Sequence, residues 1–200
     1  MKLYYAPGAC SLSPHIVARE AGVDLELDKV ANKQTAEGAD FFGVNPKGYV
    51  PALEIAPGEV LTEGPAIVQY IADQKPAANL VPPPGSTQRY RQQEMLGYIN
   101  SEIHKTYSPL FNAATPPATV EERKAYLKKR YKFIEDKLAG HDYLFGNHFT
   151  AADAYLFTVT NWAHHVKLDL SEFPNLQAFQ KRVAARPAVK QAMKEEGLIA

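Results

Sequence analysis

The sequence predicts a mixed α/β unit followed by an all-helical region. Short segments with alternating or apolar character, broken by glycine and proline, occupy most of residues 1–62. Beyond the proline-rich segment 75–85, every apolar pattern has helical spacing instead. We therefore expect an α/β domain over residues 1–78 and an all-α helical-bundle domain over residues 86–200.

The first strand is predicted at residues 2–6, where a short apolar run ends at a Pro-Gly pair. A helix follows, because Ser11 and Ser13 are both suitable N-caps and Pro14 suits the first helical position. Gly22 is a typical residue just beyond a helix end. These signals predict a strand that leads directly into a helix.

Three more strands and a second helix complete the predicted α/β domain. Residues 24–30 alternate as a strand does, and the polar segment 31–43 is predicted to be a loop with a short helical piece. Strands at 51–55 and 60–62 form a hairpin, and a helix with Pro65 in its first turn follows. This order of elements predicts one mixed four-stranded sheet.

Helical apolar faces dominate the second region. One face comprises Leu96, Ile99, Ile103 and Tyr107, and another comprises Leu127, Tyr131, Ile134 and Leu138. Thr150 and Asp153 have the spacing of a capping box, and shorter helices are predicted at 175–186 and 188–195. The lysines and arginines of 123–132 alternate with apolar residues at helical spacing, which favours a solvated helix surface over a basic binding face.

Composition and charge exclude several functional classes. The 22 basic and 22 acidic residues balance, which argues against nucleic acid or an anionic membrane as partner. No apolar run approaches the ~20 residues of a membrane span, and the one after Lys2 is too short for a signal peptide. A single cysteine excludes an internal disulfide and a cysteine-based zinc site. We therefore expect a cytoplasmic protein without a metal.

Cys10 lies where the first strand passes into the first helix. The positive end of a helix dipole favours a thiolate over a thiol, which would make this cysteine reactive. The alternative is a small buried hydrophobic residue, the usual role of a free cysteine. Its location at a helix start favours the reactive interpretation.

Val50 and Pro51 stand immediately before a predicted strand. A cis bond between them would turn the chain sharply and leave the Val50 backbone free to pair with an extended peptide. A trans proline at the start of a strand is the alternative, and the sequence does not choose between them.

Glu63 and Gly64 lie between a strand end and a helix N-terminus. Their free backbone N–H groups suit a carboxylate, whereas the alternative is that Glu63 only caps the helix electrostatically. Together with Cys10 and the Val50 backbone, this arrangement suits a short, acidic peptide that bears a thiol.

Five motifs give the chain a specific resemblance that covers nearly its whole length. They are Gly8-Ala9-Cys10-Ser11-Leu12-Ser13-Pro14-His15, Asn45-Pro46-Lys47-Gly48-Tyr49-Val50-Pro51, Leu61-Thr62-Glu63-Gly64, Glu102-Ile103-His104-Lys105 and Phe149-Thr150-Ala151-Ala152-Asp153-Ala154-Tyr155-Leu156-Phe157. In them the chain resembles a bacterial beta-class glutathione S-transferase. The resemblance implies a thioredoxin-like N-terminal domain, a helical C-terminal domain and a homodimer with glutathione at the domain cleft, as a co-substrate and without a further cofactor.

The resemblance also implies roles for individual residues. Cys10 would contact the glutathione sulfur, and Val50, before a cis Pro51, would pair with the peptide backbone. Glu63 and Gly64 would hold the γ-glutamyl end, and Lys33 the glycyl carboxylate. The residues predicted to stabilise the sulfur as catalytic groups are Cys10, Ser11 and His104, and Asn100, Ser101 and Lys105 complete the predicted glutathione site.

Gly97 is a departure from the family pattern. Members commonly carry Trp-Leu-Asn where this chain has Met95-Leu96-Gly97, and that asparagine contacts glutathione across the dimer. Glycine lacks the amide and costs a helix about 1 kcal/mol relative to alanine, so we expect something to approach this face closely. Asn100 would replace the missing contact only in part.

The function predicted from these features is transfer of glutathione to a small, largely apolar electrophile. Trp162 or His165 is expected to border the electrophile pocket, and adjacent histidines such as His164 and His165 rarely share one metal. One alternative is thiol–disulfide, peroxidase-like or reductive dehalogenation chemistry through a Cys10–glutathione mixed disulfide. Another is a non-catalytic binding protein of the same fold, against which the combination of Cys10, Val50-Pro51, Glu63 and His104 argues.

Overall fold

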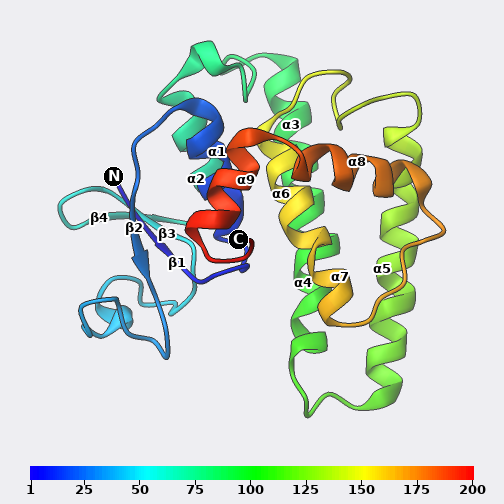
Figure 1. The fold of residues 1–200 in the computed structure, drawn as a ribbon, viewed down its shortest axis with the longest axis horizontal. Coiled ribbons are helices and arrows are strands. Elements are labelled where there is room, and N and C mark those ends of the chain that lie inside the picture. The colour runs from blue at the N-terminus through cyan, green and yellow to red at the C-terminus, as the bar shows by residue number, and fades with distance from the viewer.

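The four predicted strands form one mixed sheet in the computed structural model, which describes residues 1–200 (Figure 1). The strands are β1 (Lys2–Tyr5), β2 (Glu26–Lys29), β3 (Ala52–Ala56) and β4 (Glu59–Thr62). Their order is β2-β1-β3-β4, with β1 and β2 parallel and the other two pairs antiparallel. The predicted hairpin and the mixed sheet are therefore confirmed.

Two helices pack together beside this sheet, α1 (Leu12–Ala21) and α2 (Gly64–Asp73). Gly22 ends α1 in the left-handed region, at φ 65°, as predicted. The prediction for the start of α1 was wrong in detail. The helix begins at Leu12, so Pro14 is its third residue rather than its first, and neither serine caps it through its hydroxyl.

The proline-rich connection between the two regions is packed against the protein. It contains a short 3-10 helix, η2 (Pro76–Ala78), and the side chains of Leu80 and Val81 are buried. The Leu80 carbonyl accepts hydrogen bonds from the Ala151 N–H and the Gln92 side chain, both at 2.9 Å. These contacts fix the connection in place.

The second region is entirely helical, as predicted. Its elements are α3 (Thr87–Tyr98), η3 (Ile99–His104), α4 (Lys105–Tyr107), η4 (Ser108–Phe111), α5 (Pro117–Leu138), α6 (Ala151–Thr160), α7 (Trp162–His165), α8 (Pro174–Ala184) and α9 (Pro187–Glu195). The members of both predicted apolar faces are buried. They are Leu96, Ile99, Ile103 and Tyr107 on one face and Leu127, Tyr131, Ile134 and Leu138 on the other. The sequence did not predict that η3 is a π-helical segment inserted between α3 and α4.

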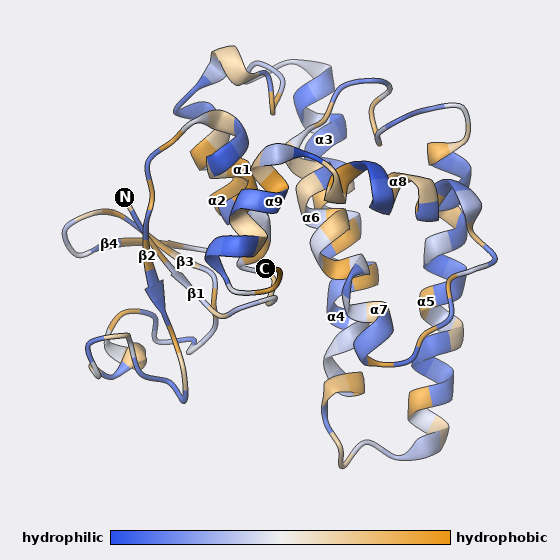
Figure 2. Ribbon diagram, in the orientation of Figure 1, coloured by the Kyte–Doolittle hydropathy of each residue, from blue (hydrophilic) through white to orange (hydrophobic).

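Helix α6 lies at the centre of the molecule, and all ten of its residues are buried. Much of it is hydrophobic, as a helix surrounded by protein must be (Figure 2). It packs against α1 and α8, and α9 returns to pack against α1 (Figure 1). A cluster of 44 buried residues runs through both regions, so one core fixes their relative position. No helix is long and apolar enough to cross a membrane.

The predicted capping box at the start of α6 is confirmed. The buried Asp153 carboxylate accepts hydrogen bonds from the Thr150 N–H at 2.8 Å, the Thr150 hydroxyl at 2.6 Å and the Leu144 N–H at 2.8 Å. Burial nevertheless raises the pKa of Asp153 to about 6. These contacts hold the first turn of α6, and with it Tyr155, against the preceding loop.

Candidate active site

Two cavities meet at Cys10, at the junction of the sheet-containing and helical regions. The larger has a volume of about 720 Å³ and the smaller about 360 Å³. The residues that line both are Cys10, Tyr49, Val50, His104 and Ser108. The structure therefore brings together three of the predicted residues, Cys10, Val50 and His104, although they come from distant parts of the chain.

The smaller cavity lies beside the start of α2. Glu63 has a backbone φ of 70°, a conformation that is rare outside glycine and is common at functional sites. Its side chain makes no cap hydrogen bond and instead pairs with Lys47 at 2.8 Å, so Glu63 does not hydrogen-bond to the first turn. The backbone N–H groups of Glu63 and Gly64 donate to no acceptor within the chain and suit a carboxylate.

The Val50–Pro51 peptide bond is cis, and Val50 lines both cavities. The preceding turn is held by Asn45, whose buried side chain donates to the Tyr49 carbonyl at 2.7 Å. Gly48 is required in this turn because its φ is 68° and a Cβ there would lie 2.6 Å from the Phe42 ring. The Val50 N–H has no acceptor in the chain, which leaves it available to a ligand backbone.

Cys10 is a thiol, not a thiolate, in the ligand-free protein. Burial raises the pKa of Cys10 to about 12, although its own N–H, the Ser11 N–H and the Lys105 ammonium all act to lower it. The thiol donates a hydrogen bond to the Val50 carbonyl. The expectation that the helix dipole favours a thiolate was therefore wrong, because desolvation outweighs the dipole at this position.

Two predicted site residues do not present their side chains to either cavity. The Ser11 hydroxyl is fully buried, donates to the Ala6 carbonyl at 3.2 Å and accepts from the Ala6 N–H at 3.1 Å. The Ser101 hydroxyl donates to the Gly97 carbonyl at 3.0 Å on an exposed helix face. The Ser11 N–H still acts on the Cys10 sulfur, and the roles of Ser11 and Ser101 in the glutathione site stay predictions.

His104, at the end of η3, lies between the two cavities. Its Nδ1 is 2.5 Å from the Tyr155 hydroxyl, and its ring packs edge-on against Trp162 with centroids 4.9 Å apart. Burial lowers the pKa of His104 to about 4, so the ring is neutral near pH 7. Asn100 and Lys105 line the smaller cavity, and the Asn100 Oδ1 accepts a hydrogen bond from the Tyr155 hydroxyl at 2.8 Å.

The larger cavity has an aromatic and aliphatic wall. Phe111, Trp162 and Leu198 line it together with His165, and the expectation that Trp162 or His165 borders the electrophile pocket stays a prediction. Lys33 is at its rim and donates to the Gly48 carbonyl at 2.7 Å. This cavity suits an apolar molecule whose reacting end points toward Cys10 and His104.

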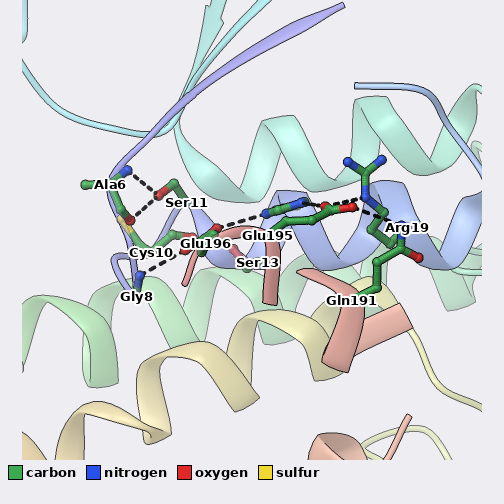
Figure 3. A network of polar contacts seen from close by, with 10 residues as sticks. Ala6, Gly8, Cys10, Ser11, Ser13, Arg19, Gln191, Glu195 and Glu196 are labelled. Atoms are coloured by element: carbon green, nitrogen blue, oxygen red, sulfur yellow. Dashed lines mark hydrogen bonds and ion pairs between the residues drawn. The ribbon is translucent and has the colours of Figure 1, made fainter. Parts of the chain in front are cut away.

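A polar network that the sequence did not predict holds the loop before Cys10 (Figure 3). The Gly8 N–H donates to the Glu196 carboxylate at 2.9 Å, and the other oxygen of that carboxylate is 3.0 Å from the His15 Nδ1. His15 is fully buried, and its Nε2 is 2.7 Å from the Glu195 carboxylate. On the other side, the Trp162 indole donates to the Gly8 carbonyl at 2.8 Å. The segment after α9 and helix α7 thus fix this loop jointly.

Comparison with known proteins agrees with this geometry. Residues 8–74 match the glutathione S-transferase N-terminal domain, and residues 98–187 match the glutathione S-transferase C-terminal domain. The glutathione S-transferase GstA of Escherichia coli O157:H7 is 46% identical over 200 residues, which cover 99% of this chain and 100% of that protein. A glutathione S-transferase of Xanthomonas campestris, GST-4.5, is 36% identical and covers 99% of this chain and 100% of that protein.

Solved structures of the same fold are equally similar. The ternary complex of BphK, a bacterial glutathione transferase, has a TM-score of 0.97 and 50% identity, and covers 99% of this chain and 100% of that one. A beta-class enzyme of Sphingomonas chungbukensis has a TM-score of 0.95 and 43% identity, with 100% of both chains covered. The thioredoxin-like fold class and the resemblance inferred from the five motifs are confirmed, and the chain belongs to the glutathione S-transferase family.

Proposed function

We propose that the protein transfers the thiolate of glutathione to small, largely apolar electrophiles. The observation that carries this proposal is the meeting of a polar and an apolar cavity at Cys10, Val50 and His104. A peptide thiol held in one cavity then faces an electrophile held in the other. Proximity and orientation of the two reactants supply much of the rate enhancement in such a site.

Glutathione would lie across the Val50 backbone. The N–H groups of Glu63 and Gly64 would hold the carboxylate of the γ-glutamyl end, and Lys105 adds a positive charge to the same cavity. The Val50 N–H, which has no acceptor in the chain, would pair with the peptide, and Lys33 would pair with the glycyl carboxylate at the larger cavity. Complexes with glutathione are known for similar chains, including a sphingomonad glutathione S-transferase that is 45% identical.

Conjugation would proceed by attack of the bound thiolate on the electrophile. The S–H bond of glutathione is broken, the sulfur forms a bond to the electrophilic carbon, and the leaving group departs with its electron pair. Cys10 would contact the sulfur, and His104 lies where it can exchange the thiol proton. Phe111, Trp162 and Leu198 would exclude water from the electrophile.

Redox chemistry through a Cys10–glutathione mixed disulfide is the second candidate. It is favoured by the position of the Cys10 sulfur at the junction of both cavities. It is disfavoured by the raised pKa of Cys10, because the thiolate is the attacking species in thiol–disulfide exchange. Conjugation does not need a Cys10 thiolate and is therefore the better supported function.

The organisation around this site is part of the proposal. Residues 1–78 would form the glutathione-binding domain and residues 86–200 the domain that supplies most of the electrophile site. A homodimer would complete each site from the neighbouring subunit, and a reducing compartment, the cytoplasm, would keep both glutathione and Cys10 reduced.

Retention on immobilised glutathione, followed by a conjugation assay with an aryl halide, tests the proposal. We expect retention, elution by free glutathione and formation of the thioether product. Retention without product, for several electrophiles, would favour the non-catalytic binding protein. Failure of retention would overturn the assignment of the smaller cavity to glutathione.

A further inference from the structure

Tyr155 joins the two η3 side chains that face the smaller cavity. Its hydroxyl lies 2.5 Å from the His104 Nδ1 and 2.8 Å from the Asn100 Oδ1. Tyr155 is on α6 and is almost completely buried. No sequence motif suggested this contact, because the residues lie 51 and 55 positions apart.

Asn100 and His104 are four positions apart in η3 and lie on one helix face, so both side chains can contact one hydroxyl. Residues Ile99–His104 form a π-helical segment within an otherwise α-helical run. Such segments have a wider turn than an α-helix and occur frequently at functional sites. In this chain the π-helical segment begins beside Asn100 and ends at His104, so the irregularity coincides with the two Tyr155 contacts.

The positions of the protons follow from these contacts. A tyrosine hydroxyl has one proton to donate, and an amide oxygen can only accept. Tyr155 therefore donates to Asn100, and the short contact on its other side requires a proton on the His104 Nδ1. Since the ring is neutral, Nε2 carries a lone pair, and it has no hydrogen-bond partner in the chain.

Several groups face this ring from the elements packed around it. The Cys10 thiol and the Tyr49 ring line the same cavities, and Trp162 packs edge-on against it. The Lys105 ammonium disfavours an imidazolium, whereas the Glu63 carboxylate favours one. A thiolate formed beside Nε2 would add a second negative charge, closer than that of Glu63, and would likewise favour the imidazolium.

We propose that Tyr155 and Asn100 are positioning residues that hold His104 with its proton on Nδ1, so that Nε2 accepts the thiol proton of glutathione. The inference rests on the proposed function for its substrate. In the step, the S–H bond breaks and an Nε2–H bond forms, giving a thiolate and an imidazolium. The thiolate then attacks the electrophile, whose leaving group departs with its electron pair, and the imidazolium returns its proton to water.

The tautomer is tested first, by ¹⁵N NMR of the imidazole nitrogens in the free protein. His104→Gln assigns the signals. We expect Nδ1 to be the protonated nitrogen in the wild type. Tyr155→Phe and Asn100→Ala should both shift the population toward the other tautomer, whereas Asn100→Asp keeps an acceptor and should keep the wild-type tautomer. A wild-type ring protonated on Nε2 would overturn the proposal, and this test needs neither glutathione nor activity.

The catalytic consequence is tested by the pH dependence of conjugation. We expect Tyr155→Phe to lower kcat by about tenfold or more at pH 6.5, less than the ~100- to 10,000-fold of a lost general base, because the His104 ring itself remains. The loss should shrink toward pH 9, where the thiol ionises unaided, and the KM for glutathione should change little. The ultraviolet absorbance of bound thiolate should show the same shift to higher pH.

Tyr131→Phe is the matched control, because it removes a buried hydroxyl whose partner is the Tyr107 hydroxyl, 2.9 Å away, and Tyr131 lines neither cavity. It should leave the pH profile unchanged. If Tyr155→Phe fails to fold, the same pH profile is measured with Asn100→Ala, because the Asn100 side chain lines the smaller cavity. An unchanged profile in Tyr155→Phe would overturn this inference, whereas a wild type that does not bind glutathione would instead overturn the proposed function.

Discussion

The Cys10 thiol donates a hydrogen bond to the Val50 carbonyl, with 3.3 Å between sulfur and oxygen. This bond joins the loop before α1 to the residue that precedes the cis proline. A thiolate has no proton to donate and would instead face the carbonyl lone pairs. The hydrogen bond to Val50 and the raised pKa of Cys10 therefore both indicate a protonated sulfur.

Alkylation of Cys10 should be slow at neutral pH. The pKa of Cys10 is raised to about 12, compared with about 8.5 for an ordinary cysteine, and only the thiolate reacts. At pH 7.5 we expect iodoacetamide to label Cys10 more than ~100-fold more slowly than a cysteine in an unstructured peptide. Intact mass as a function of time, from pH 6.5 to 10, measures the rate.

The labelling rate should continue to rise through pH 9 and 10, beyond the range in which the peptide control levels off. Oxidised glutathione should add a single adduct, equally slowly, and dithiothreitol should remove it, since the chain has no second cysteine. Rapid labelling at pH 7 would show that the helix dipole outweighs burial, and would restore the redox alternative.

Leu198→Ala should weaken binding of the electrophile without affecting glutathione. Leu198 lines the larger cavity and not the smaller one. Each buried methylene contributes about 0.8 kcal/mol, and the side chain is partly exposed, so we expect the KM for an apolar electrophile to rise about three- to tenfold. Steady-state kinetics with each substrate varied in turn measures both KM values.

Ile199→Ala is the control for Leu198→Ala. Ile199 is exposed like Leu198 but lines neither cavity. It should change neither KM. Equal effects of the two substitutions would mean that the segment after α9 acts through its backbone, and not through the Leu198 side chain.

Asp153→Ala should destabilise the protein by about 2–4 kcal/mol. The substitution leaves the Leu144 N–H and the Thr150 N–H and hydroxyl without their acceptor and removes a helix cap. Urea unfolding followed by circular dichroism measures the change. Asp136→Ala is the control, because Asp136 is an exposed acid paired with Lys132 and should change stability by less than about 1 kcal/mol.

Asp153 also gives stability a pH dependence. Its pKa is raised to about 6, whereas an unfolded aspartate titrates near 3.9, so between these values the folded state holds a proton that the unfolded state has lost. Its contribution is therefore fully present below pH ~4 and is lost as the pH rises through about 6. The stability difference between wild type and Asp153→Asn should fall over this window. A constant difference would mean that Asp153 stays ionised.

Gly97→Asn should tighten glutathione binding if the protein is a dimer. A Cβ at Gly97 meets no atom within 4 Å, so the chain itself has room for the side chain. One added hydrogen bond contributes about 0.5–1.5 kcal/mol, which is about a two- to twelvefold lower Kd by calorimetry. Gly97→Ala fills the same space without an amide and should not tighten binding. A monomeric mass by light scattering, with full activity, would contradict the dimer.

Much of the fold could be predicted because its signals are local. Gly22 ends a helix, Thr150 and Asp153 start one, and a turn between two short apolar segments specifies the β3–β4 hairpin. Each of these depends on residues within a few positions of one another. The family resemblance that predicts roles for Val50 and His104 also rests on short motifs, and the structure places both residues where two cavities meet.

The rest depended on contacts between distant segments. The Ser11 hydroxyl had several potential partners near it in sequence, and only the folded loop shows that Ala6 binds it. Cys10 is half-buried among residues from distant parts of the chain, so the pKa of its thiol could not follow from the helix start alone. The π-helical turn of η3 and the approach of Tyr155 leave no signature in composition or spacing.

The bond between the Gly8 N–H and Glu196 spans 188 positions in the chain. Bringing together the ends of so long a stretch of chain costs conformational entropy before the contact forms. A nascent chain that has not yet been translated through residue 196 therefore lacks the clamp on the loop before Cys10, even when its sheet is complete. In the same way, a substitution at Glu196 would loosen the loop before Cys10, although Glu196 lines neither cavity.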